Sequence, residues 1–182
     1  MKIISGKYKG RILNGYDING TRPTMDRVKE SLFGMIQEYV PNSCVLDLYS
    51  GSGNLGIECL SNGASKAYLV DINKIAIDTI SKNIKLLNIN NANVIKSNAK
   101  DALNNFLNQN IKFNLIFLDP PYDTNELDKS LTFINNNTNL LEHDSLIICE
   151  TTKDLDYNKY DNFIIYKCRD YKDKKITILK FI

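Results

Sequence analysis

Short apolar runs along the chain alternate with segments in which apolar positions recur every three or four residues. The runs are rich in Val, Ile, Leu and Phe and predict buried strands, whereas the spaced positions predict amphipathic helices. The predicted helices cover residues 54–62, 73–88, 99–109 and 126–136. The predicted strands cover residues 44–48, 67–71, 92–96, 113–118, 145–150, 162–168 and 175–181. Such alternation indicates an α/β fold, with a mostly parallel sheet covered by helices on both faces. Only the short stretch 170–174 separates the last two strands, so one of them must run antiparallel.

The amino-terminal residues stand apart from this alternation. Residues 1–20 are expected to form a β-hairpin appendage with turns near Asn14-Gly15 and Asn19-Gly20. Thr24 can cap a helix over residues 25–39, within the segment 21–40. Its apolar face is expected to carry Val28, Leu32, Ile36 and Tyr39. With the core at 44–182, the whole of 1–182 is expected to be a single domain.

Composition limits the class of protein. Hydrophobic residues make up 43% of the chain and charged residues 24%, which is typical of a globular protein. No apolar run approaches the length needed to span a membrane, and the start lacks a signal peptide's apolar stretch, so a cytoplasmic protein is expected. The four cysteines, Cys44, Cys59, Cys149 and Cys168, are scattered and are expected to be buried free thiols. No metal site is expected, because no pair has ligand spacing, and the sole histidine is expected in a loop or helix cap.

The net charge of +2 does not by itself suggest a nucleic-acid partner, but its distribution does. Residues 1–16 hold four basic side chains and no acidic one, and residues 167–180 hold six basic and two acidic ones. Basic segments on a nearly neutral chain favour phosphate contacts. The amino-terminal cluster is the stronger candidate, since Tyr8 lies among its lysines and offers a ring for stacking.

The tetrapeptide Asp119-Pro120-Pro121-Tyr122 directly follows the predicted strand 113–118. It therefore leaves the carboxyl end of a strand, where open α/β sheets bind their ligands. Two prolines make the loop stiff, with a carboxylate before them and an aromatic ring after them. Such a loop can hold a planar amine, because carboxylate and carbonyl oxygens accept its N–H bonds while the ring stacks on its face. Pro-Pro could also merely end a strand.

A glycine-rich turn, Gly51-x-Gly53-x-x-Gly56, follows the strand that ends near Asp47. It matches the dinucleotide-binding pattern, and Asp71 follows Gly51 at the expected distance. Asp47 would repel a pyrophosphate but favours the positive charges of S-adenosylmethionine, whose carboxylate can still use the helix N-terminus. Asp71 would then bind the ribose hydroxyls. Asp47 could also be a carboxylate that caps the turn.

These motifs together resemble the class I S-adenosylmethionine-dependent methyltransferases that modify amino groups. The segments Thr21-Arg22-Pro23-Thr24-Met25-Asp26-Arg27-Val28-Lys29-Glu30 and Leu55-Gly56-Ile57-Glu58-Cys59-Leu60 are similar to the RsmD family, which methylates the exocyclic N2 of a guanine in bacterial small-subunit ribosomal RNA. The resemblance runs nearly end to end and implies a Rossmann-like, seven-stranded sheet with one antiparallel strand. Tyr49, Ser50 and Asn54 depart from the family's usual Phe, Ala and small residue.

The resemblance implies roles for particular residues. Asp119 and the Pro120 carbonyl would hold the amine, and Tyr122 would stack on the base, so that Tyr122→Phe should be tolerated. The expected cofactor residues are Asp47, Ser50, Gly51, Gly53, Asp71, Ile72, Asn98 and Ala99. The expected RNA contacts are Lys7, Lys9, Arg11, Arg22, Thr24 and Arg27. Arg22 and Arg27 could instead clamp the cofactor's carboxylate or pack the amino-terminal segment. The implied partner is ribosomal RNA or a small-subunit assembly particle, bound by a monomer.

Three other functions remain open at this stage. The first is N6-adenine methylation of RNA or DNA, which uses similar loops; a separate target-recognition domain does not fit in 182 residues. The second is NAD-dependent oxidation, which Asp47 disfavours. The third is a non-catalytic RNA-binding assembly factor on the same fold, which the intact Asp119 and glycine turn disfavour.

Overall fold

The computed structural model describes residues 1–15, 26–122, 124–152, 155–172 and 174–182. Its strands are β1 (Cys44–Asp47), β2 (Lys66–Asp71), β3 (Ala92–Lys96), β4 (Phe113–Leu118), β5 (Leu141–Thr151), β6 (Phe163–Tyr171) and β7 (Lys174–Phe181). Its α-helices are α1 (Asp26–Ile36), α2 (Asn54–Ser61), α3 (Lys74–Leu87), α4 (Ala99–Asn108) and α5 (Glu126–Asn136). Short 3-10 helices cover Gln37–Tyr39, Thr138–Leu140 and Tyr157–Lys159.

The seven strands form one sheet in the order β3-β2-β1-β4-β5-β7-β6. Pairing is parallel from β3 through β5, and β7 is antiparallel to both of its neighbours, β5 and β6. This confirms the predicted α/β fold with one reversed strand. The strand β5 begins at Leu141, four positions before the predicted start, and the exposed His143 lies in it rather than in a loop.

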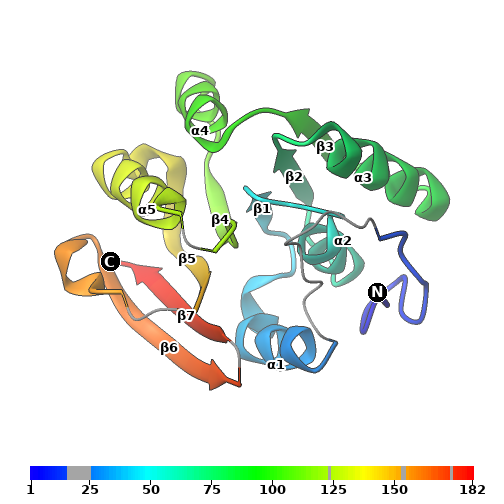
Figure 1. Cartoon of the computed structure of the whole chain (residues 1–182), viewed down its shortest axis with the longest axis horizontal. Helices are drawn as coiled ribbons and strands as arrows, with labels where there is room; N and C mark the ends of the chain where they lie inside the picture. The colour runs from blue at the N-terminus through cyan, green and yellow to red at the C-terminus, as the bar shows by residue number, and fades with distance from the viewer. Residues whose placement is uncertain (16–25, 123, 153–154, 173) are drawn as a thin grey trace.

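Side-chain alternation along the strands divides the core into two layers. Val45 of β1 and Leu115 of β4 belong to a cluster with α1, α2 and α3, whereas Leu46 and Ile116 belong to a cluster with α4 and α5. The helices accordingly cover both faces of the sheet (Figure 1). Full burial on both faces explains why these strands read as continuous apolar runs.

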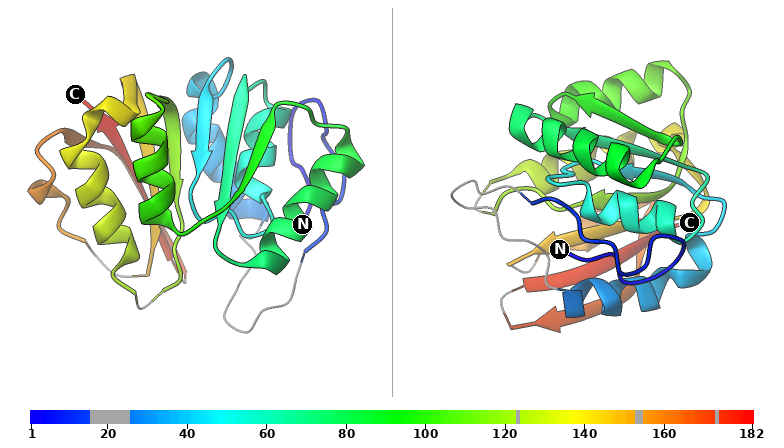
Figure 2. Two further views of the ribbon diagram at one scale, coloured as in Figure 1. Left: turned by 90° about the horizontal axis from the view of Figure 1, so that it is seen from above. Right: turned by 90° about the vertical axis from the view of Figure 1, so that its right-hand side faces the viewer.

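The amino-terminal segment folds back on itself, but not as predicted. A single antiparallel bridge pairs Lys2 with Ile12, and the chain turns between Ser5 and Gly10. This turn at Ser5–Gly10 was not predicted, whereas the turn predicted near Asn14-Gly15 continues past the described residues and Asn19-Gly20 lies outside them. Residues 1–15 lie beside α2 and α3 (Figure 2), with Ile3 and Leu13 buried in the core.

The four cysteines are only partly as expected. Cys59 and Cys149 are buried, Cys44 is half-buried and Cys168 is exposed, and all four are free. The expectation of four buried thiols is wrong for Cys168, because it lies on the edge strand β6, whose side chains after Phe163 are exposed or half-buried.

Candidate functional site

The predicted site residues gather where the order of strands reverses. From β1 the chain builds outward through β2 to β3, and it then returns to place β4 on the other side of β1. Open α/β sheets bind ligands at such a switch point, beyond the carboxyl ends of the strands. Asp47 ends β1, Asp71 ends β2, and Asp119 directly follows β4. Because β1 pairs in parallel with β2 and β4, all three carboxylates lie at the same edge of the sheet.

Asp47 is buried under the start of α2. Its Oδ2 accepts the backbone N–H of Gly56 at 3.0 Å. Burial raises the pKa of this carboxyl to about 7; the Gly56 bond acts in the opposite direction, and nearby Asp71 adds to the rise. A Cβ added at Gly56 would lie 2.1 Å from Cδ2 of Leu69, so only glycine lets the helix approach the strand this closely. Burial thus disfavours the charged form of Asp47, and a bound cation would stabilise that form.

The glycine turn has the backbone that its sequence predicts. Gly51 and Gly53 both have positive φ, at 55° and 81°, which residues with a side chain rarely adopt. The Ser50 hydroxyl donates to the Asp47 carbonyl at 2.6 Å, and its N–H donates to the Val70 carbonyl at 2.9 Å. These bonds fix the turn between the ends of β1 and β2, with the N-terminus of α2 beside it.

Asp71 supports the same turn. Its Oδ2 accepts the Gly51 N–H at 2.9 Å, and its Oδ1 accepts the Asn73 N–H at 2.8 Å. The next residue, Ile72, is 67% exposed, which is unusual for a large apolar side chain. A half-buried carboxylate can accept hydrogen bonds from the hydroxyls of a ribose, and an exposed apolar side chain next to it can pack against a base.

The structure gives Asn98 a local function that the sequence analysis did not weigh. Asn98 is the N-cap of α4: its Oδ1 accepts the Asp101 N–H at 2.9 Å, and its Nδ2 donates to the Asp101 carboxylate at 2.7 Å. An Asn three residues before an Asp at a helix start was the signal for this cap. Ala99 is buried directly behind it. Contact of either residue with a cofactor remains a prediction.

The Asp119-Pro120-Pro121-Tyr122 loop lies beyond β4, with Pro120 buried and Pro121 exposed. Asp119 is half-buried, and burial raises the pKa of its carboxyl to about 8. The carboxylates of Glu150 and Asp47 raise this pKa further, and Lys174 lowers it. Tyr122 is 40% exposed, so part of this residue is accessible to a ligand.

Glu150 and Lys174 complete the site and were missed by the sequence analysis. The Tyr122 hydroxyl donates to Oε1 of Glu150 at 2.7 Å, and Nζ of Lys174 donates to the same oxygen at 2.6 Å. Glu150 was recognisable as an acidic residue at the end of a predicted strand. Lys174 had no such signal, because its position depends on the antiparallel placement of β7.

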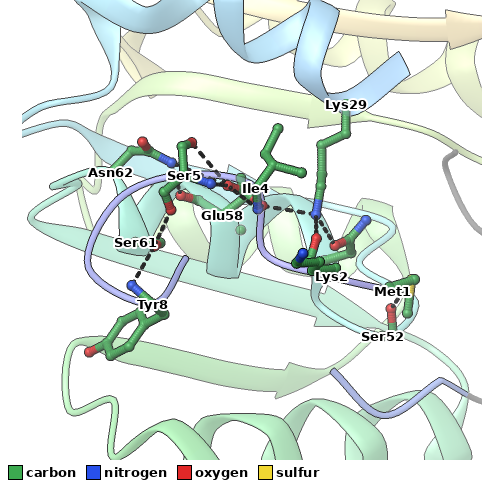
Figure 3. Close-up of polar contacts among 12 residues, drawn as sticks. Met1, Lys2, Ile4, Ser5, Tyr8, Lys29, Ser52, Glu58, Ser61 and Asn62 are labelled. Atoms are coloured by element: carbon green, nitrogen blue, oxygen red, sulfur yellow. Dashed lines mark hydrogen bonds and ion pairs between the residues drawn. The ribbon is translucent and has the colours of Figure 1, made fainter. Parts of the chain in front are cut away.

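The amino-terminal segment is held to α2 by a buried ion pair, which was also missed (Figure 3). Lys29 of α1 donates to Oε2 of Glu58 at 2.8 Å, to the Lys2 carbonyl at 2.7 Å and to Oδ1 of Asn54 at 2.7 Å. Glu58 in turn accepts the Ile4 N–H at 3.1 Å. Lys29 lies three positions before Leu32 and seven before Ile36, both buried, and this spacing was the signal.

Hydrogen bonds place this segment beside the glycine turn. The Asn83 amide of α3 donates to the Ser52 carbonyl at 3.1 Å and to the Asn14 carbonyl at 3.1 Å. At the other end, the Ser61 hydroxyl accepts the Tyr8 N–H at 2.9 Å (Figure 3). A partner that contacts residues 1–15 would therefore lie next to the candidate cofactor site.

The predicted RNA contacts have different surroundings. Lys7, Lys9, Arg11 and Arg27 are exposed, whereas Arg22 and Thr24 lie outside the described residues. In the carboxy-terminal segment, by contrast, three lysines are held in ion pairs. The pairs are Lys174 with Glu150 at 2.6 Å, Lys175 with Asp170 at 3.7 Å and Lys180 with Asp144 at 2.9 Å. The amino-terminal segment therefore remains the better candidate for phosphate contacts.

Comparison with known proteins agrees with this geometry. The family model described as Conserved hypothetical protein 95 matches residues 1–180. Ribosomal RNA small subunit methyltransferase D of Buchnera aphidicola subsp. Acyrthosiphon pisum is 36% identical over 175 residues, which are 96% of this chain and 87% of the relative. The chain belongs to the RsmD family. YlbH of Bacillus subtilis is 41% identical over 86% of this chain and 85% of its own length. The solved structure of yhhF from Escherichia coli has a TM-score of 0.85 and 27% identity, over 100% of this chain and 97% of that one.

Membership of the RsmD family confirms the predicted resemblance, and the chain is a methyltransferase. Among the described residues, no group of three or more His, Cys, Asp or Glu side chains is arranged to hold a metal ion. Within the same residues, every helix is too short or too polar to cross a membrane.

Proposed function

We propose that this protein transfers a methyl group from S-adenosylmethionine to the exocyclic N2 amine of a guanine in small-subunit ribosomal RNA. The observation that carries the proposal is the meeting of Asp47, Asp71 and Asp119 at one edge of the sheet, beside the glycine turn. The names of the relatives point to the same RNA.

The cofactor site is proposed from charge and shape. Asp47 and Asp119 have raised pKa values, so a ligand that carries positive charge would bind there and lower both. S-adenosylmethionine carries a sulfonium and an ammonium, whereas the pyrophosphate of NAD would add negative charge. Asp71 would accept the ribose hydroxyls, and Ile72 would pack on the adenine. Ser50, Gly51, Gly53, Asn98 and Ala99 complete the proposed site.

The catalytic contribution of the chain is proposed to be orientation. The N2 lone pair of guanine is delocalised into the ring, so the amine is a poor nucleophile. Asp119 and the Pro120 carbonyl would accept its two N–H bonds and turn the lone pair toward the methyl group that the cofactor supplies. Tyr122 would stack on the base, which must leave its neighbours to enter the loop. Such orientation contributes roughly 7–11 kcal/mol in well-aligned systems.

Contact with RNA is proposed for the exposed side chains of Lys7, Lys9, Arg11 and Arg27. Tyr8 N–H and Lys7 N–H are both tied to Ser61, at 2.9 Å and 2.7 Å, so the backbone that presents these charges is fixed. Arg22 and Thr24 stay predictions from the sequence.

A transfer assay tests the proposal. Purified protein and S-adenosylmethionine with a labelled methyl group are incubated with naked small-subunit RNA and with assembled particles, and the RNA is digested to nucleosides. Labelled N2-methylguanosine is the expected product, and Asp119→Ala should abolish it. Labelled N6-methyladenosine would favour adenine as the target, and absence of label on either substrate would favour a non-catalytic assembly factor.

A further inference from the structure

The ends of β4 and β5 bring two acidic residues together. In the parallel register of these strands, Leu118 is opposite Cys149. The next positions are Asp119 and Glu150, so the two residues lie side by side at the edge of the sheet that holds the site. Glu150 is absent from the amine-binding motif, and the proposed reaction assigns it no role.

One oxygen of the Glu150 carboxylate nevertheless contacts that motif. Its Oε1 accepts both the Tyr122 hydroxyl at 2.7 Å and Nζ of Lys174 at 2.6 Å. The side chain of Glu150 is 8% exposed and that of Lys174 is 11% exposed. A charge-assisted bond in such a shielded place restricts the tyrosine more than a bond in water would.

We propose that Glu150 and Lys174 are positioning residues: Glu150 fixes the ring of Tyr122, and the two together set the charge that surrounds Asp119. This inference rests on the proposed methyl transfer. Neither residue needs to touch the base or the cofactor.

The first half of the proposal concerns the ring. Tyr122 follows the stiff Pro120-Pro121 pair, but its own side chain still has two rotatable bonds. The bond from its hydroxyl to Glu150 fixes the far end of the ring and so restricts rotation about these bonds. Tyr122→Phe keeps the ring and loses the anchor. The structure therefore replaces the expectation that Tyr122→Phe is tolerated with an expected loss of activity.

The second half concerns Asp119. Among the described residues, the charged groups that act on it most are Glu150 from β5, Lys174 from β7 and Asp47 from β1. Glu150 and Asp47 favour the protonated acid, and Lys174 favours the carboxylate. The carboxylate accepts an N–H bond of the amine more strongly than the protonated acid does. Lys174 thus offsets part of the effect of Glu150, and the pKa of Asp119 stays raised at about 8. The positive charge of bound S-adenosylmethionine would lower it further and favour the carboxylate.

Carbon-13 NMR titration of Asp119 tests the charge, with the signal assigned by Asp119→Asn. Glu150→Gln retains an oxygen acceptor for Tyr122 and removes the charge, so the pKa of Asp119 should fall by roughly one unit. Lys174→Met should raise it by roughly as much. Glu142→Gln, an exposed change on the same strand, is the matched control and should leave it unchanged. Identical pKa values in all four proteins would overturn this half.

Kinetics test the anchor. Tyr122→Phe should slow methyl transfer roughly tenfold, because a hydrogen bond to a charged group is lost. In a Glu150→Ala background the same change should alter the rate less than about twofold. Equal effects of Tyr122→Phe with and without Glu150 would overturn the anchor. The acid limb of the pH–rate profile should move to lower pH for Glu150→Gln and to higher pH for Lys174→Met. The titration needs no RNA, so a wild-type protein that fails to methylate guanine would refute the proposed function separately.

Discussion

The ammonium of Lys29 lies 2.8 Å from Oε2 of Glu58, and both side chains have no exposed surface. The pair joins α1 to α2, and its remaining bonds go to the amino-terminal segment and to Asn54, the first residue of α2. Burying two charges is costly unless every donor and acceptor is satisfied, and here the ammonium has three acceptors. The pair therefore specifies how the amino-terminal segment docks beside the cofactor turn.

Loss of one partner should be severe. Lys29→Met leaves the Glu58 carboxylate buried without a counter-charge, and the free energy of unfolding should drop by about 3–5 kcal/mol. Urea denaturation measures this. Adding Glu58→Gln in the same chain should restore part of the loss, because the amide oxygen still accepts the Ile4 N–H and no charge stays buried. A loss below about 1 kcal/mol for Lys29→Met would contradict the assigned role.

Two glycines of the amino-terminal turn offer a matched pair. Gly6 and Gly10 both have positive φ, at 77° and 85°. A Cβ at Gly6 would lie 1.9 Å from the Ser61 carbonyl oxygen, whereas one at Gly10 would meet only Lys2 Cε at 4.0 Å. Gly10→Ala should therefore cost about 1–2 kcal/mol for the backbone alone. Gly6→Ala should cost clearly more, since the segment must also move away from α2. Equal unfolding energies for the two variants would show that the close contact with Ser61 is unimportant.

Asp71 is expected to matter for cofactor affinity. Asp71→Ala removes the proposed ribose acceptor and should weaken binding of S-adenosylhomocysteine by about 1.5–3 kcal/mol. Isothermal titration measures this, with Asp78→Ala on the exposed side of α3 as the control. The wild-type protein should give no saturable signal with NAD. Saturable NAD binding without a response to S-adenosylhomocysteine would contradict the proposed cofactor.

The amino-terminal charges should govern the salt dependence of RNA binding. Replacing Lys7, Lys9 and Arg11 by Ala should weaken binding and flatten the log–log slope, because each lost phosphate contact removes roughly 0.7 from it. The control combines Lys66→Ala and Lys112→Ala. Lys66 begins β2 and Lys112 directly precedes β4, so both lie at the amino ends of strands, away from the site, and the slope should change little. Filter binding at several salt concentrations measures both. An unchanged slope in the triple variant, on RNA that is methylated, would make the segment purely structural.

The pattern of apolar residues was enough to predict the sheet and the edge at which Asp47, Asp71 and Asp119 meet. The reason is that the carboxyl ends of parallel strands share one edge, so knowing where a strand stops is enough to place its last side chain. The turn at Ser5–Gly10 was missed because an Asn-Gly pair is a strong local signal, while the fit of Gly6 against Ser61 depends on residues far apart in sequence.

Other parts of the site depend on tertiary pairing. Glu150 contacts Tyr122 only because β5 is next to β4, and Lys174 arrives only because β7 inserts between β5 and β6. The spacing of Lys29 from Leu32 and Ile36 indicates a buried position, but its partner Glu58 lies on another helix. Each of these side chains contacts a partner more than twenty residues away in the sequence. The local sequence pattern does not specify which distant residue becomes that partner.

The most direct measurement is nucleoside mapping of small-subunit ribosomal RNA by mass spectrometry. It compares cells with the chain, cells without it, and cells that carry only Asp119→Ala, with folding of the variant checked by circular dichroism. The account predicts one guanine that bears an N2-methyl group in the first cells and lacks it in the other two. Full methylation with folded Asp119→Ala, or a change confined to N6-methyladenine, would contradict it.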